Sequence, residues 1–258
     1  MKERLAELGR QLQGVIGAFG RITLFAWQVA LAAVKPPIRV RLSVNAVYEI
    51  GFLSLSLIAA SGLAVGAVLG LQGYHNMARF GAEESLGAFV GLSLIRELGP
   101  VLTGLLVTGR AGSSIAAEIS SMVTTEQLDG LRMMSVDPIH YVVLPKVVGM
   151  MICMPLLSAI FIVCAIIGGH LVGVELLGLD SGVYIASLED AVDFREDVLG
   201  SIIKAFVFGL SIGLVATYRG FTSEPTAVGV SRSTTATVVI GSVWILFTDL
   251  LITALWGV

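Results

Sequence analysis

The chain has 258 residues, of which 55% are hydrophobic and only 14% are charged, and its mean hydropathy is +0.90. A soluble globular domain of this length carries more charge, so the composition excludes that class. The net charge of −3 says little about partners, because the charges are divided between the two sides of the expected membrane. Several uncharged runs are long enough to cross a bilayer, which needs about 20 apolar residues. The sequence therefore predicts an all-α polytopic membrane protein that forms a single domain over residues 1–258.

The first 34 residues predict an amphipathic helix that lies in the membrane interface. Its apolar residues recur at helical spacings of three and four, and polar residues lie between them: Leu5, Leu8, Leu12, Val15, Phe19 and Ile22, interleaved with Arg4, Arg10, Gln11 and Arg21. Trp27 is a suitable interfacial anchor. The alternative is a soluble helix that packs on a core. The segment lacks the pattern of a signal peptide, and Lys35-Pro36-Pro37 ends the helix.

Five apolar runs predict five membrane-spanning helices within residues 47–258. They cover residues 50–74, 85–109, 147–174, 198–218 and 234–256, with a kink in the third near Pro155. In the first span, Gly62, Gly66 and Gly70 recur every four residues. Such a stripe lets another helix approach closely, so we expect it to be a helix-packing surface.

The distribution of charge predicts which loops face the cytoplasm. Residues 1–46 contain seven Lys or Arg and two Glu, and basic residues flank the 110–146 and 219–232 segments. The 175–197 connection contains seven acids and one Arg. Because Lys and Arg favour the cytoplasmic side, we expect the N-terminus and the two basic segments there. The acidic connection and the C-terminus are then expected on the other side.

Ionisable residues inside the predicted spans are the first candidates for a functional site. They are Arg96, Glu97, Lys204 and Asp249. One interpretation is structural: Lys204 pairs with Asp249, or Glu97 with a base, and the pair only fixes helix register. The other is that these residues line a wet cavity. Pro100 favours the second interpretation in the second span, because proline offers no N–H to the carbonyl of Arg96 and weakens the helix where it is charged.

The 110–146 segment predicts a cytoplasmic coupling helix between the second and third spans. Thr124 and Gln127 match a capping box, which predicts a helix over residues 124–134 that ends at Asp137-Pro138. Leu128, Leu131 and Met134 share one face of it. An apolar face of this kind suits docking into a groove of a partner, and the alternative is a helix that rests on its own bundle.

Motifs of catalysis and nucleotide binding are missing from the sequence. There is no GxxxxGK[ST] phosphate loop, no GxSxG elbow and no HExxH motif. Three histidines, His75, His140 and His170, are scattered and do not have the spacing of metal ligands. We therefore expect a non-catalytic chain that binds neither ATP nor a metal.

Five segments resemble the MlaE family, the permease subunits of the Mla phospholipid-transport ABC system, akin to YrbE and toluene-tolerance permeases. They are GLQGY (residues 70–74), RELGP (96–100), GRAGSSIAAEI (109–119), TEQLDGLRMMSVDP (125–138) and GVSRSTTATVV (229–239). They occur in the family's order and span nearly the whole chain, so the five together are highly specific.

The resemblance implies a homodimer in the inner membrane of a Gram-negative bacterium. From its helix-packing pattern, we expect the glycine stripe near the axis of such a dimer. It also implies an MlaF-like ATPase that carries ATP and Mg²⁺, an MlaB-like STAS-domain protein and an MlaD-like ring of MCE domains in the periplasm. The substrate would be a phospholipid moving between the inner and outer membranes, in support of outer-membrane lipid asymmetry. No nucleic acid is expected. The ATPase would contact the coupling helix through Glu126, Gln127, Leu128, Leu131 and Met134.

The lipid is expected in a central cavity where the outer end of the first span meets the second. Antiparallel spans bring these parts together, and Glu97 lies a dozen residues after Ser85, or roughly 18 Å along a helix. The expected lining is Gln72, Tyr74, Met77, Phe80, Arg96 and Glu97. Two alternatives remain open at this point: an ion-coupled carrier that uses Lys204 and Asp249, and a membrane scaffold that does not transport.

Overall fold

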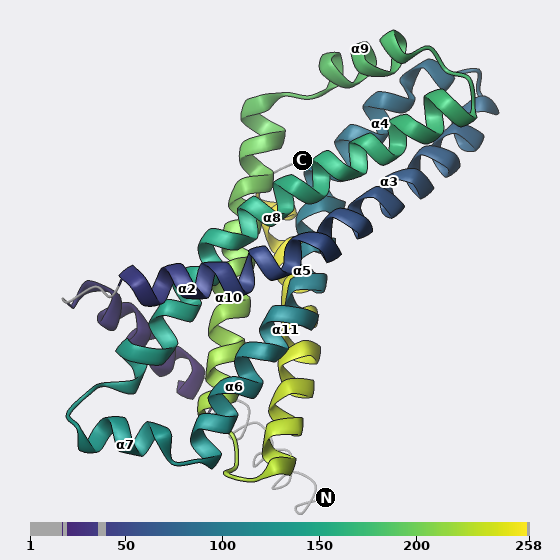
Figure 1. The fold of residues 1–258 in the computed structure, drawn as a ribbon. Coiled ribbons are helices and arrows are strands. Elements are labelled where there is room, and N and C mark those ends of the chain that lie inside the picture. Colours follow the sequence, from purple (N-terminus) through teal and green to yellow (C-terminus); the bar gives the residue numbers. More distant parts are fainter. Residues whose placement is uncertain (1–16, 18–19, 36–39, 257–258) are drawn as a thin grey trace, which may run out of the picture.

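The computed structural model describes residue 17, residues 20–35 and residues 40–256, and this part of the chain is helical without strands (Figure 1). Its α-helices are Gly20–Val34, α2 (Val40–Ile50), α3 (Leu55–Ala78), α4 (Leu86–Ser93), α5 (Gly99–Val107), α6 (Ser113–Thr124), α7 (Gln127–Met133), α8 (Leu144–His170), α9 (Ser181–Ala191), α10 (Leu199–Phe221) and α11 (Ala227–Trp256). Short 3₁₀ turns, η1 (Phe52–Ser54) and η2 (Glu83–Ser85), precede α3 and α4. Five π-helical segments join or extend the helices: η3 (Leu94–Leu98), η4 (Thr108–Gly112), η5 (Ile139–Val143), η6 (Leu171–Leu176) and η7 (Phe194–Val198).

Five helical runs are long and apolar enough to cross a membrane, which confirms the predicted all-α polytopic class. They are Val40–Ala78, Glu83–Thr124, Ile139–Leu176, Phe194–Phe221 and Ala227–Leu255. Each is longer than its predicted span. The first run has 39 residues, or roughly 58 Å of helix, so it extends well beyond a hydrocarbon core of about 30 Å. Hydropathy identified only the most apolar part of each helical run, and the helices continue into the more polar residues on either side.

The predicted coupling segment, residues 110–146, is mostly a continuation of the two spans around it. The second run continues through η4 and α6 to Thr124, and the third begins at Ile139. Only residues 125–138, which include α7, connect them. A boundary at Arg110 was predicted because the segment becomes more polar there, but α6 packs against α10 and α11 and therefore stays helical.

The helices form an upright bundle and an arm that diverges from it (Figure 1). The bundle contains α5, α6, α10 and α11, whereas α3, α4 and the outer part of α8 form the arm, which carries α9 at its end. Helix α8 belongs to both, and its most extensive packing is with α3 and α10. The two parts are thus held together by one long helix.

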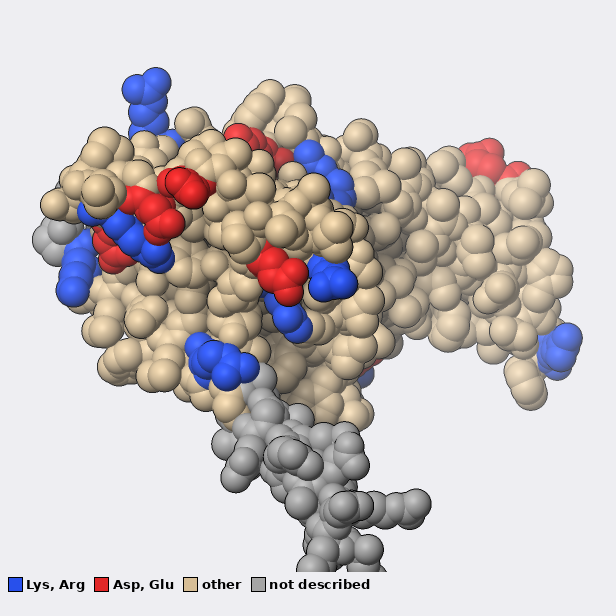
Figure 2. Space-filling model, turned by 90° about the horizontal axis from the view of Figure 1, so that it is seen from below, with Lys and Arg blue, Asp and Glu red and all other residues tan. Residues whose placement is uncertain are grey.

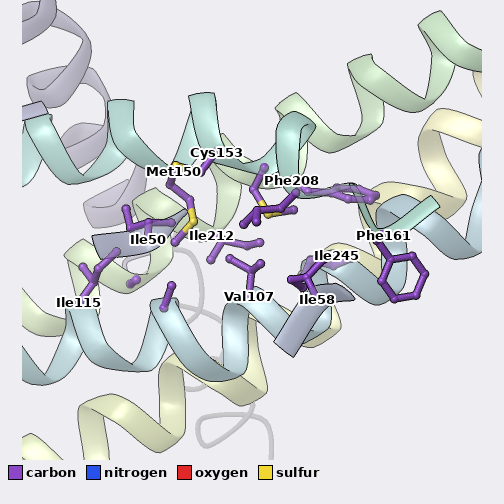
Figure 3. Packing of buried hydrophobic residues seen from close by; sticks show 14 of the residues in the cluster. Ile50, Ile58, Val107, Ile115, Met150, Cys153, Phe161, Phe208, Ile212 and Ile245 are labelled. Atoms are coloured by element: carbon purple, nitrogen blue, oxygen red, sulfur yellow. The ribbon is translucent and has the colours of Figure 1, made fainter. Parts of the chain in front are cut away.

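A continuous apolar core follows α8 through the molecule (Figure 3). Met150 and Phe161 of α8 are fully buried, and so is Phe208 of α10. A smaller cluster joins Phe25 and Val29 of the helix Gly20–Val34 to the start of α8. Trp27 on the same helix is 64% exposed, as an interfacial anchor would be. The rest of the predicted amphipathic helix, residues 1–16 and 18–19, lies outside the described residues, as do Pro36 and Pro37.

The glycine stripe of the first span packs against another helix, as predicted, but that helix is α8 of the same chain. A Cβ atom on Gly62 would lie 2.7 Å from the carbonyl oxygen of Phe161, and one on Gly70 would lie 2.9 Å from that of Gly169. A Cβ on Gly66 would overlap the backbone of Ala165. The stripe therefore sets the spacing of α3 and α8 within one protomer, and the face that was expected near a dimer axis is covered by α8.

The connections between the helices lie at two opposite ends of the molecule, as the charge pattern predicts. Arg132 of α7 lies over the ring of Phe221 at the end of α10, 5.7 Å from its centroid. Helix α9 lies at the opposite end of the molecule (Figure 1). Charged side chains gather on the face that is seen from below, and the arm is nearly free of them except at its tip (Figure 2). The 110–146 and 219–232 segments therefore share one side.

Helix α9 lies in the acidic 175–197 connection, where no helix was predicted. Asp180 caps it by accepting a hydrogen bond from the backbone N–H of Val183. Tyr184 anchors it on the arm: its side chain is buried, and burial raises the pKa of its hydroxyl to about 12. A Cβ on Gly87 of α4 would overlap the Tyr184 backbone, so α9 and α4 also meet through a small residue.

Replacing Gly66 with alanine should destabilise the chain, because the new methyl group has no room against the α8 backbone. Overpacking of this kind costs about 1–3 kcal/mol, and backbone overlap puts it at the upper end. We expect a clear drop in the midpoint of thermal unfolding in detergent. The matched control is Gly109→Ala, because a Cβ there would have no described atom within 4 Å apart from its chain neighbours and the backbone of its own helix. Equal midpoints for the two variants would contradict the packing.

Candidate functional site

Arg96 and Glu97 lie on a small polar cleft at the junction of η3, η7, α10 and α11. Its lining is Arg96, Glu97, Glu196, Asp197, Gly200, Ser201, Lys204, Ile252 and Thr253. The free volume is about 20 Å³, which is room for about one water molecule. The cleft is therefore a packed polar junction in this conformation, with no room for a lipid.

Lys204 is the centre of this junction. Its side chain is only 8% exposed, and its Nζ donates hydrogen bonds to Glu97 Oε1 at 2.9 Å and to Thr253 Oγ1 at 2.8 Å. The predicted pair with Asp249 is confirmed, with Lys204 Nζ 3.4 Å from Asp249 Oδ1. Glu97 is the closer carboxylate, so one ammonium group joins the second, fourth and fifth spans.

The break at Pro100 explains why Lys204 binds the second span at this point. Proline cannot donate to the carbonyl of Arg96, and the helix here widens into the π-helical segment η3. The freed Arg96 carbonyl accepts a hydrogen bond from Lys204 Nζ at 2.9 Å. Both groups would be costly without a partner at membrane depth. The backbone carbonyl at the predicted weak point of the second span is thus satisfied by a side chain from another helix.

Arg96 has a partner of its own, Asp197 at the start of the fourth span. Arg96 Nε donates to Asp197 Oδ1 at 2.6 Å, and the Asp197 side chain is 1% exposed. Its other oxygen accepts from the backbone N–H of Asp193 at 2.9 Å. From the sequence, Asp197 was counted only as one acid of the 175–197 connection, and its role was missed. The signal was its position, seven residues before Lys204 and thus on the same helical face.

Two cations therefore meet three carboxylates in this part of the membrane. Asp249 Oδ1 is buried and makes no hydrogen bond to any described residue, although it lies beside Lys204. Glu97 is both ion-paired and 40% exposed on its side chain. The arrangement joins helices, as the structural interpretation expects, and it leaves one carboxylate accessible at the edge of the junction.

The four expected cavity residues of the first span lie elsewhere. None of Gln72, Tyr74, Met77 and Phe80 lines the polar cleft. Tyr74 and Met77 are half-buried against the core, whereas Gln72 is exposed and Phe80 is 85% exposed. Within one chain, the residues expected to share a cavity form two separate surfaces: the polar cleft and the open face of α3.

The predicted coupling helix exists, but the capping box is wrong. Thr124 is the last residue of α6, and its hydroxyl donates to the Ser120 carbonyl at 2.9 Å. Helix α7 starts only at Gln127, after Glu126 in a left-handed conformation (φ 57°). The reason is that α6 continues the second span, so Thr124 is held inside a helix and cannot begin one.

The apolar face of α7 is turned mainly towards its own bundle. Leu128 is 4% exposed and belongs to the core, and Leu131 is half-buried against it. Met134 is 67% exposed and Met133 is 88% exposed, while Glu126 and Gln127 are exposed at the start of the helix. The apolar surface of α7 that a partner can reach is therefore at its C-terminal end, around Met133 and Met134.

Comparison with known proteins gives the family. Residues 43–255 match the model of the family described as Permease MlaE. The chain belongs to the MlaE permease family. Its relatives include the intermembrane phospholipid transport system permease protein MlaE of Haemophilus influenzae, 43% identical over 253 residues, which are 97% of this chain and 96% of the relative.

Other relatives come from Rickettsia conorii and Arabidopsis thaliana. A probable ABC transporter permease protein of Rickettsia conorii is 41% identical over 96% of both chains. The chloroplastic protein TRIGALACTOSYLDIACYLGLYCEROL 1 of Arabidopsis thaliana is 30% identical over 90% of this chain and 66% of its own length. An ABC permease takes its energy from a separate ATPase subunit, so the family does not favour an ion-coupled carrier built on Lys204 and Asp249.

Replacing Lys204 with methionine should leave Glu97 and Asp249 without their shared cation. Removing one partner of a buried ion pair costs about 3–5 kcal/mol, and the partial exposure of Glu97 reduces this figure. We expect a lower midpoint of thermal unfolding in detergent. The double variant Lys204→Met/Asp249→Asn should recover part of the loss, because one unpaired charge is removed. A single variant as stable as the wild type would contradict the central role of Lys204.

Proposed function

We propose that this chain is the permease subunit of an ABC transporter that moves phospholipids between the inner and outer membranes of a Gram-negative bacterium, and so maintains lipid asymmetry. The observation that carries the proposal is the 43% identity, over 97% of the chain, to a permease named for intermembrane phospholipid transport. The charged junction between the second, fourth and fifth membrane spans supports it, because a lipid head group needs polar contacts at membrane depth.

The lipid-binding residues are proposed to be the exposed face of α3 together with the accessible edge of the polar cleft. Phe80 and Met77 would contact acyl chains, and Gln72, Tyr74, Arg96 and Glu97 would supply polar contacts. Since the polar cleft alone has room for about one water, the lipid requires a second surface. A homodimer supplies that surface and encloses the lipid between two protomers.

The other subunits are proposed from the same family. An MlaF-like ATPase binds ATP and Mg²⁺ and docks on α7, an MlaB-like STAS-domain protein accompanies it, and an MlaD-like MCE ring receives the lipid. This places α7 and the N-terminus in the cytoplasm and the C-terminus in the periplasm. The permease itself contributes no catalytic residue and binds no cofactor.

Docking of the ATPase on α7 can be tested at Met134, which is 67% exposed. Met134→Asp places a charge in the docked surface and should reduce co-purification of the ATPase, because burying such a side chain is worth about 1.5–3 kcal/mol. Leu176→Asp is the matched control, since Leu176 is 70% exposed at the other end of the molecule. Leu128→Asp should instead destabilise the permease itself. Normal co-purification with the Met134 variant would refute docking at this position.

Transport can be tested with Glu97→Gln, which keeps the shape of the side chain and removes its charge. In proteoliposomes that contain the assembled complex, ATP-driven transfer of a fluorescent phospholipid should fall roughly tenfold, the factor that corresponds to 1.4 kcal/mol. Assembly should be unchanged, because Lys204 keeps Thr253 and the Arg96 carbonyl as partners.

The surface variant Glu84→Gln serves as the control and should transport normally. Loss of assembly without a change in lipid binding would show that Glu97 only joins helices. Transfer that runs on an ion gradient without the ATPase would instead support the ion-coupled carrier and reject the ABC mechanism.

A further inference from the structure

A second cleft lies between α8 and α10, next to the polar cleft. It has a free volume of about 190 Å³. Its lining is Ile95, Pro155, Ser158, Ala159, Ile162, Val163, Val198, Ser201 and Ile202. These residues come from η3, η7, α8 and α10, which are parts of the second, third and fourth spans. The cleft therefore lies within the membrane-spanning part of the chain, away from the α3 face.

The chemistry of this lining suits a hydrocarbon chain. Seven of its nine residues have side chains without polar atoms, and the other two are serines. An apolar cavity of about 150 Å³ in another protein stays dry and binds benzene. A somewhat larger apolar cleft at membrane depth should likewise take hydrocarbon in preference to water.

The size of the cleft selects one acyl chain. Sites for whole drug-sized ligands have volumes of about 300–1,000 Å³, so 190 Å³ holds a chain segment and no complete lipid. A transmembrane helix is about 10 Å across and would not enter it. The rim includes Val163 and Ile202, which are 56% and 43% exposed, so a chain can enter from the surface of the helices.

Ser158 shows where a polar group of the ligand would lie. It is 2% exposed, and its Oγ makes no hydrogen bond to any described residue. Most serines in helices satisfy their hydroxyl on a carbonyl of the preceding turn, as Ser211 does with Val207. A buried hydroxyl without a partner is costly, so Ser158 is suited to donate to an acceptor on an occupant of the cleft.

Ser201 connects this cleft to the charged junction. It is 5% exposed and lines both clefts, with Arg96 and Lys204 on one side and Ile202 and Val198 on the other. A ligand that has an apolar chain between α8 and α10 therefore has its polar end directed to a region of hydroxyls and cations.

We propose that the cleft between α8 and α10 is a binding site for one acyl chain of a membrane phospholipid, whose ester carbonyl accepts a hydrogen bond from Ser158. The site needs only a phospholipid bilayer around the chain, so it goes beyond the proposed transport and does not depend on ATP. It is separate from the lipid surface proposed on α3.

The test uses phosphatidylglycerol with a diazirine in one acyl chain, mixed into nanodiscs that contain the full chain without nucleotide. After illumination, lipid adducts should be found by mass spectrometry in residues 155–163 and 198–202. Ala159→Phe fills the cleft and should reduce these adducts to background. Leu156→Phe is the matched control, because Leu156 is 59% exposed on the same helix and does not line the cleft.

A third variant, Ser158→Ala, keeps the volume of the cleft and removes the hydroxyl. Loss of one neutral hydrogen bond should lower adduct yield about two- to tenfold. Adducts that are absent from both segments, or that are equal in Ala159→Phe and wild type, would overturn the site. So would replacement of the lipid adducts by protein cross-links when the partner subunits are present. A variant that loses adducts but still transports would leave the proposed function standing, so the two proposals can fail separately.

Discussion

The hydrogen bond from Lys204 to the carbonyl of Arg96 is the interaction on which the membrane-embedded part of this protein depends. Pro100 has no N–H to donate to that carbonyl four residues before it, and Lys204 is an ammonium group in an apolar helix. Each group would be expensive alone at membrane depth, and each satisfies the other. Because Lys204 also binds Glu97 and Asp249, one side chain fixes the relative positions of three spans.

The two clefts follow from this junction. Helices α10 and η3 are held together at Lys204, which closes the polar cleft to about the size of one water. On the side of the junction that faces α8, small and branched apolar residues make the packing, and the larger cleft between α8 and α10 remains open there. Ser201 forms part of both walls. A charged contact therefore lies directly beside an apolar one, which is the combination that an amphiphile requires.

The sequence was sufficient for the features that depend on local composition and period. Apolar runs gave five spans, and a spacing of four residues identified Gly66 as part of a packing stripe. The free-energy cost of a lone charge in hydrocarbon was enough to predict that Lys204 pairs with Asp249. The missing N–H of Pro100 located the weak point of the second span. Each of these inferences follows from a property of a residue and its neighbours in the chain.

By itself, then, the sequence determined the fold class, the five membrane spans, the family and most of the charges that are buried between the spans. Only the tertiary structure decided their partners: α8 for the glycine stripe, Glu97 and Thr253 for Lys204, and the bundle for Leu128 of α7. The physical reason is that helix periodicity specifies which residues share a face, whereas the neighbour of that face depends on how all the helices pack. A capping box at Thr124 fails for the same reason, since packing keeps α6 helical through that residue.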